Sequence, residues 1–162
     1  MRSFKKGDEK SLIRNINNKK IARYTLHIPY PYKLKDARSW INLNLKLDKK
    51  KQKPKINFAI DIDGNVIGGI GLDKMEGHKA EIGYWLGEKY WRKGIMTEAV
   101  KLVAEFGFKK LGLKRICAFV FLPNKISARV LKGAGYKYEG RQRKNVMKNG
   151  KFFDDLVFAK VI

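Results

Sequence analysis

The most chemically informative stretch of the sequence is a basic turn, from Trp91 to Gly94, between an apolar segment and a helix-forming one. The first backbone N–H groups of a helix lack acceptors within the helix, and together with the helix dipole they bind phosphate groups. Gly94 would let the backbone approach such a group, Arg92 and Lys93 add positive charge, and Thr97 adds a hydroxyl donor. The turn therefore predicts a diphosphate site. A plain strand-to-helix connection, with Gly94 only as a turn residue, is the alternative.

The elements that would position this turn are a strand at 80–86 and a helix at 94–110. The helix carries one apolar stripe, formed by Ile95, Ala99, Leu102, Val103 and Phe106. Two strands precede them, at 57–62 and 66–72, and the segment Asp63-Gly64-Asn65 between these two is a hairpin signal.

The C-terminal part continues with a strand at 115–121 and a short helix at 124–134, which Gly133 and Gly135 are suited to stop. A second hairpin, 136–147 with 151–161, closes around Asn149-Gly150. Strands and helices in this order predict an α/β domain with a mixed sheet.

The N-terminal part predicts two helices separated by an aromatic loop. Gly7-Asp8-Glu9 opens the first, Asp36 starts the second, and the loop at 23–33 contains two prolines. The lysine-rich segment 46–55 is interpreted as a solvated loop that closes the second helix, with a nucleic-acid patch as the alternative.

Length and composition bound the function. The chain has 162 residues and is interpreted as one domain, 1–162. It contains no apolar run of about 20 residues and does not start like a secretory signal, so no membrane role is expected and the expected compartment is cytoplasmic. A single cysteine, Cys117, excludes a disulfide framework and a cysteine metal cluster, and no metal is expected.

The charge of the chain is strongly positive, at +22. Such a field attracts polyanions, although a general preference for lysine in the source organism would produce the same composition. The segment 61–88 is different, because six acids and two bases give it a net charge of −4.

Motifs spread over nearly the whole chain resemble the GNAT N-acetyltransferase superfamily, and most of all its branch that acetylates the N-termini of ribosomal proteins. The turn from Tyr90 to Ala99 resembles the acetyl-CoA-binding turn, and 122–136 resembles an Asn-x-x-Ser helix that runs into a Gly-aromatic strand. Segments 28–41 and 149–155 resemble the substrate-side helices and the closing hairpin. The resemblance implies a mostly antiparallel sheet, flanked by helices and splayed between the strands at 80–86 and 115–121, with a very short N-terminal strand at 1–4.

The resemblance also implies how acetyl-CoA is held. Backbone N–H groups of residues 92–97 (Arg92, Lys93, Gly94, Ile95, Met96 and Thr97) would bind the pyrophosphate. The strand end at Trp85 and Leu86 would pair with the pantetheine arm. Asn124 would hold the pantetheine, or only cap the helix.

For catalysis, the resemblance implies direct attack of an amine on the thioester. Ser127 is the candidate acid for the leaving thiolate, with an ordinary first-turn serine as the alternative. Related enzymes often carry a glutamate base nineteen residues after this serine, where this chain has Val146. Glu81 is therefore the candidate base or amine-orienting carboxylate, or else an exposed glutamate at a strand end. Tyr30, Tyr32 and Trp85 are candidates for the acceptor channel, or for the core.

The missing glutamate favours an acceptor that needs little help to lose its proton. With a pKa of about 7.7–8.0, roughly a tenth of a protein's α-amine is neutral at pH 7, whereas a lysine ε-amine near 10.4 is charged about two thousand times more often than neutral. An α-amine of a protein N-terminus is the predicted acceptor. A small neutral or acidic amine is the alternative, as is a non-catalytic basic module that binds RNA or ribosomes. The chain is expected to be a monomer or homodimer.

Overall fold

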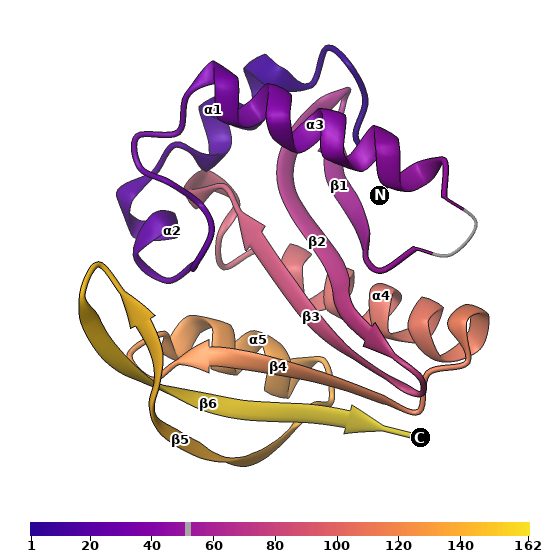
Figure 1. Ribbon diagram of the computed structural model, residues 1–162, viewed down its shortest axis with the longest axis vertical. Helices are drawn as coiled ribbons and strands as arrows, with labels where there is room; N and C mark the ends of the chain where they lie inside the picture. The colour runs from indigo at the N-terminus through magenta and orange to yellow at the C-terminus, as the bar shows by residue number, and fades with distance from the viewer. Residues whose placement is uncertain (51–52) are drawn as a thin grey trace.

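The computed structural model describes residues 1–50 and 53–162 and contains a six-stranded sheet with helices on both faces (Figure 1). The strand order is β1-β2-β3-β4-β6-β5, and the β3–β4 contact is the parallel one. The mixed, mostly antiparallel α/β fold expected from the sequence is confirmed. Along the chain the elements are α1 (Glu9–Ile16), α2 (Lys19–Arg23), α3 (Leu34–Asp48), β1 (Ile56–Ile62), β2 (Asn65–Glu76), β3 (Lys79–Leu86), the 3-10 helix η1 (Glu88–Tyr90), α4 (Ile95–Leu111), β4 (Arg115–Phe121), α5 (Lys125–Gly133), β5 (Lys137–Lys148) and β6 (Lys151–Val161).

The sheet buries a separate core on each face. In Figure 1, α1, α2 and α3 gather over the upper end of the sheet, and α4 and α5 lie behind the strands. The α4-side core includes Ile82, Val100 and Phe158, and the α1-side core includes Leu12 and Trp85. Successive side chains of a strand point to opposite faces of the sheet. The core that a strand residue packs against therefore shows which face its neighbours along the strand occupy.

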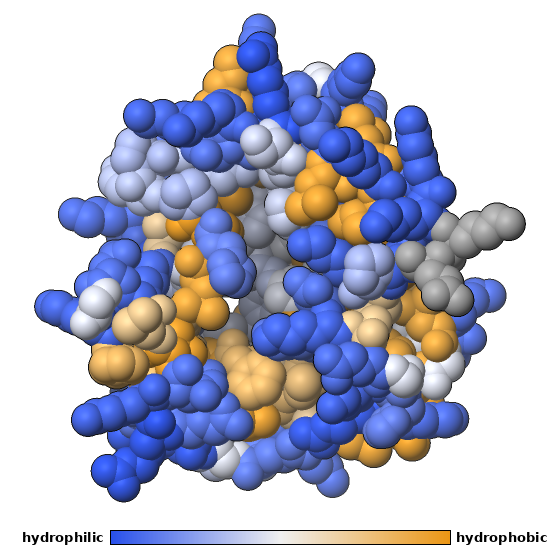
Figure 2. Space-filling model, in the orientation of Figure 1, coloured by the Kyte–Doolittle hydropathy of each residue, from blue (hydrophilic) through white to orange (hydrophobic). Residues whose placement is uncertain are grey.

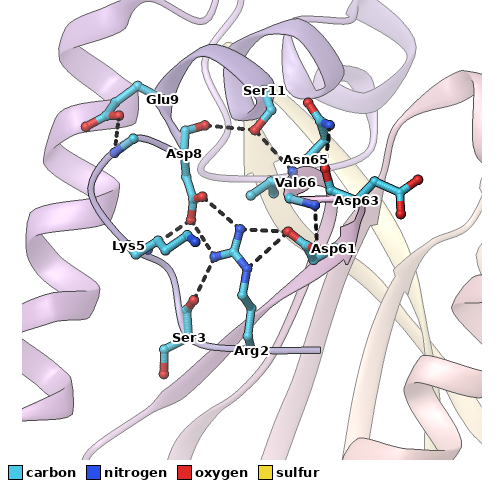
Figure 3. A network of polar contacts seen from close by, with 12 residues as sticks. Arg2, Ser3, Lys5, Asp8, Glu9, Ser11, Asp61, Asp63, Asn65 and Val66 are labelled. Carbon is cyan, nitrogen blue, oxygen red and sulfur yellow. Dashed lines mark hydrogen bonds and ion pairs between the residues drawn. The ribbon is translucent and has the colours of Figure 1, made fainter.

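An ion network anchors the start of the chain (Figure 3). The Arg2 guanidinium lies 2.8 Å from the carboxylate of Asp8, which is 2% exposed, and 2.7 Å from that of Asp61. Burial alone would raise the pKa of Asp61, but the hydrogen bonds from Arg2 and the Gly64 N–H and the nearby positive charges lower it below its usual value. The expected strand at 1–4 is wrong in extent, because only Arg2 forms a bridge, to Ala59 of β1.

Two helix starts differ from the sequence prediction. The second predicted helix, α3, begins at Leu34 rather than Asp36, because Asp36 sits in its first turn and accepts a hydrogen bond from the Lys33 N–H at 2.8 Å. The five-residue helix α2 was not predicted at all. Asn18 caps it by accepting from the Lys20 N–H at 2.8 Å.

The segment 46–55 only partly forms the expected loop, since α3 continues to Asp48 and Lys53 forms an ion pair with it. Residues 51–52 of that segment lie outside the described part of the chain. At the end of α5, Gly135 takes a φ of 85° and stops the helix as expected. Gly133 has another role: a Cβ there would lie 3.3 Å from the Thr97 side chain, so glycine lets α5 pack closely on the first turn of α4.

Candidate functional site

The sheet opens between β3 and β4. These strands pair only from Lys79–Arg115 to Glu81–Cys117 and then diverge, which confirms the predicted splay. In the described part of the chain, the edge of β3 that faces β4 has no strand partner over residues 82–86. A cleft of about 1830 Å³ runs through the opening, and Figure 2 shows a hollow near the middle of the molecular face, bordered by both hydrophilic and hydrophobic residues.

The turn into α4 places free amide groups on this cleft. Gly94 caps the helix with a φ of 76°, and a Cβ there would meet no atom within 4 Å, so glycine is needed for its conformation rather than for space. Arg92 is also left-handed, with a φ of 61°. Among the described residues, the N–H groups of 94–97 have no acceptor, and all of residues 92–97 line the cleft. This is the donor arrangement that binds phosphate at a helix N-terminus.

Trp91 fastens this turn to the end of β3. Its indole Nε1 donates a hydrogen bond to the Leu86 carbonyl at 2.7 Å, and its ring packs against both cores. Trp85 and Leu86 both line the cleft, at 9% and 8% exposure. The Leu86 carbonyl is already hydrogen-bonded, so a ligand that adds along β3 would rely on the backbone groups before it.

Ser127 meets a partner that the sequence analysis did not single out. The Tyr84 hydroxyl lies 2.8 Å from Ser127 Oγ and 3.3 Å from the Ser127 carbonyl oxygen. Burial raises the pKa of Tyr84 well above its usual value, with a smaller opposite effect of the Ser127 hydrogen bond, so the phenol stays protonated at neutral pH. The alternation of side chains along β3 could have identified Tyr84 from the sequence. Tyr84 lies two residues after the buried Ile82, so both side chains face α4 and α5.

Asn124 lies at the start of α5 and lines the cleft. Its side-chain Oδ1 accepts from the Ser127 N–H at 3.2 Å, so Asn124 caps the helix. The cap also fixes the position of Ser127. In the described chain the Asn124 Nδ2 has no acceptor, which leaves it free for a ligand.

Glu81 lies where β3 and β4 part. Its carboxylate is 2.8 Å from the Lys74 ammonium, and this hydrogen bond raises the pKa of Lys74. The side chain of Glu81 is 26% exposed and lines the cleft on the face opposite to α4. The ion pair with Lys74 occupies the carboxylate of Glu81, which is therefore not free to hold an acceptor amine.

The two loop tyrosines have separate surroundings. Tyr32 is buried in the α1-side core and reaches the cleft, and burial together with the charge of Asp36 raises its pKa to about 12. Tyr30 is 54% exposed and is not among the residues that line the cleft. The structure therefore brings Tyr32 to the site and leaves Tyr30 outside it.

Positive charge dominates the cleft. The described lining residues include seven lysines and arginines against three carboxylates, from Asp73, Glu81 and Asp155. Of the six acids in segment 61–88, only Asp73 and Glu81 line the cleft; Asp61 instead binds Arg2, and Glu88 binds Lys20. The excess of cations suits a ligand that carries several phosphates.

Comparison with known proteins decides the family, because residues 1–137 match the acetyltransferase (GNAT) domain. The chain belongs to this family. The uncharacterized N-acetyltransferase YoaA of Bacillus subtilis is 38% identical over 98 residues, which cover 59% of this chain and 55% of YoaA. YnaD of the same organism, also an uncharacterized N-acetyltransferase, is 34% identical over 125 residues, which cover 76% of this chain and 71% of YnaD.

Solved structures agree with the GNAT assignment. The ribosomal-protein-S5-alanine acetyltransferase of Vibrio fischeri superposes with a TM-score of 0.85 at 25% identity, over 99% of this chain and 91% of that one. For two of the curated relatives, the matched segments span only 55% and 44% of the relative's length. None of the helices in residues 1–50 and 53–162 has the length and apolar character needed to cross a membrane.

Proposed function

We propose that this GNAT protein transfers an acetyl group from acetyl-CoA to the α-amine of a protein N-terminus. The observation that carries the transfer is the row of free amides at 94–97 beside the open edge of β3. Such amides bind a diphosphate, and a free strand edge binds an extended arm with alternating donors and acceptors. Acetyl-CoA has both features. Arg92 and Lys93 border the same turn and would neutralise part of the phosphate charge.

The other residues of the cleft fit a direct transfer. Bound acetyl-CoA would supply an acetyl thioester, whose thiolate leaves readily. The β3 edge at 82–86 and the free Nδ2 of Asn124 would hold the pantetheine arm in place. Ser127 would protonate the leaving sulfur, and the Tyr84 hydroxyl orients the Ser127 hydroxyl from 2.8 Å.

The choice of a protein N-terminus rests on the bases in the cleft. Val146 stands where the enzymes that this chain resembles often carry a glutamate, and the carboxylate of Glu81 is paired with Lys74. An α-amine loses its proton far more readily than a lysine side chain, so it needs less help from the carboxylates of the cleft. The V. fischeri neighbour, described as acting on an alanine of a ribosomal protein, supports the same acceptor class.

A turnover experiment tests this proposal. The purified protein would be incubated with acetyl-CoA and a library of peptides with free N-termini, with small neutral and acidic amines in parallel, and products read by mass spectrometry. Acetylation at peptide N-termini supports the proposal. Turnover of small amines alone would show that the acceptor is a small amine and not a protein N-terminus. RNA binding without affinity for acetyl-CoA would contradict the enzymatic function itself.

A further inference from the structure

Asp155 on β6 is a buried carboxylate with an unsatisfied oxygen. Its side chain is 1% exposed, and its Oδ1 has no hydrogen-bond partner among the described residues. Its Oδ2 accepts from the Asn145 Nδ2 at 3.1 Å. An unpaired buried carboxylate oxygen is costly to the folded state, so its presence needs a reason. Asp155 also lines the cleft, which suggests that the missing partner is a ligand.

The register of the sheet places Asp155 beside the reacting end of the cleft. Asp155 pairs with Phe121, the last residue of β4, and Phe121 is followed closely along the chain by Asn124 and Ser127. Its neighbour Leu156 packs against the α4-side core, so Asp155 points to the opposite face of the sheet. The Glu81 side chain on β3 points to that same face. An amine that enters the cleft from this face would therefore have Asp155 and Glu81 on its side of the sheet.

The adjacent residue Asp154 differs from Asp155 because its carboxylate is fully engaged in the hairpin. Asp154 binds Arg141 and accepts the Lys144 N–H at 2.8 Å, so it is used to hold the β5–β6 hairpin. The register of that hairpin shifts between Gln142 and Val146, and the extra residues of β5 bring Asn145 onto Asp155. Asp154 thus uses its carboxylate to stabilise the hairpin, whereas Asp155 keeps one carboxylate oxygen without a partner among the described residues.

We propose that Asp155 binds the ammonium group of the acceptor and removes its proton, in place of the glutamate that Val146 replaces. This inference rests on the acetyltransferase function proposed above. The ammonium gives one proton to Asp155 Oδ1, which later releases it to water. The neutral amine forms the new C–N bond as the C–S bond of the thioester breaks. The sulfur takes a proton from Ser127, and the nitrogen returns its second proton to Ser127 through solvent.

The test compares Asp155→Asn with Asp154→Asn. Both substitutions keep the shape of the side chain. Comparing them therefore separates the effect of the Asp155 carboxylate oxygen that lacks a partner among the described residues from that of the hydrogen-bonded carboxylate of Asp154. Asp155→Asn is expected to lower kcat/KM for a peptide α-amine about 100-fold, within the usual range for a lost general base. Its Kd for acetyl-CoA should stay within twofold of wild type. Because the change removes an unpaired buried charge, its melting temperature should equal or exceed that of wild type. Asp154→Asn should lower the melting temperature and leave kcat/KM within threefold.

Two further measurements distinguish a proton acceptor from a structural group. A peptide with an N-terminal aminooxyacetyl group has a nucleophilic nitrogen that is already neutral at pH 7, so Asp155→Asn should lower its turnover less than fivefold. Adding Val146→Glu to Asp155→Asn should recover at least tenfold of the lost activity. Equal losses on both peptides, unchanged turnover of the α-amine, or a large fall in melting temperature would each overturn the proposal for Asp155. A wild-type protein that acetylates no amine would instead overturn the proposed function.

Discussion

The phenol oxygen of Tyr84 lies 2.8 Å from the hydroxyl of Ser127, so β3 and α5 are hydrogen-bonded to each other at the open part of the sheet. Tyr84 reaches this position because it faces the helices behind the sheet, where burial keeps its hydroxyl protonated. The serine hydroxyl is thus held by a neutral partner that can either donate or accept. This arrangement ties the orientation of Ser127 to the strand that borders the cleft.

Tyr84→Phe removes only this hydroxyl. We expect turnover to fall about tenfold, because Ser127 loses the partner that orients it, and we expect a larger fall for Ser127→Ala. Isothermal titration should find the affinity for acetyl-CoA unchanged in both. Tyr136→Phe is the matched control, since the buried Tyr136 hydroxyl has no hydrogen-bond partner in the described residues. Equal turnover of the Tyr84 and Tyr136 variants would remove Tyr84 from the mechanism.

Gly94→Glu should abolish binding of acetyl-CoA, because it places a carboxylate among the amides that would hold the phosphates. Gly112→Glu is its counterpart at the other end of α4. Both glycines have positive φ, 76° and 69°, and neither has an atom within 4 Å of a built Cβ. The two variants should therefore carry similar backbone strain. Titration calorimetry should find binding lost only in Gly94→Glu, and unchanged affinity of Gly94→Glu would refute a phosphate site at this turn.

Arg2→Met should destabilise the fold by about 3 kcal/mol, because it leaves the buried carboxylate of Asp8 without its charged partner. Asp61→Asn should cost less than about 1 kcal/mol, since Asp61 is partly exposed and solvent replaces the lost contact. Urea denaturation at pH 7 measures both. The order of the two losses is the prediction, and a reversed order would contradict the network.

The same network predicts how stability changes with acid. The pKa of Asp61 is lowered in the folded protein, so its contribution to stability is complete above the ordinary carboxylate pKa of about 4 and is lost as the pH falls through the depressed value. Melting temperatures of wild type should therefore drop below about pH 4. Asp61→Asn should flatten this drop, and parallel curves for the two proteins would argue against the contribution of Asp61.

Charge predicts which amines the protein rejects. At +22, the chain repels polycations at long range, so spermidine should be a poorer acceptor than a peptide with acidic residues behind its N-terminus. The difference in kcat/KM should shrink as salt is added, because salt screens the field. A preference for spermidine at low ionic strength would contradict this expectation.

The sequence predicted the parts of the fold that have a local signature. Periodic apolar residues predicted the strands and helices. The basic glycine turn before α4 stood out by its residue types, but its spacing alone left a plain strand-to-helix connection open, and the family resemblance was needed to interpret it. The helix α2 was not predicted, because five residues are too few to show the periodic spacing of apolar residues that marks a helix. Its position depends on a distant contact, in which the Lys148 ammonium donates to the carbonyls of Ala22 and Thr25. A contact across more than 120 residues leaves no mark in a short window of sequence.

The candidate site divides in the same way. The amides of the turn and the cap at Asn124 follow from local rules and were expected. The partners of Tyr84 and the free oxygen of Asp155 depend on which face of a strand a residue occupies and on one register shift in a hairpin. Tyr30 and Tyr32 are two residues apart and of the same type, yet only the buried Tyr32 reaches the cleft.

The short parallel contact between β3 and β4 has a consequence for handling the protein. Within the described residues, 82–86 of β3 have no strand partner on the side that faces β4, and such edges recruit strands from other molecules. A cosubstrate that lies along this edge occupies the same hydrogen-bonding groups. Protein kept without it should therefore self-associate more readily, so CoA would serve in storage buffers as a guard against aggregation.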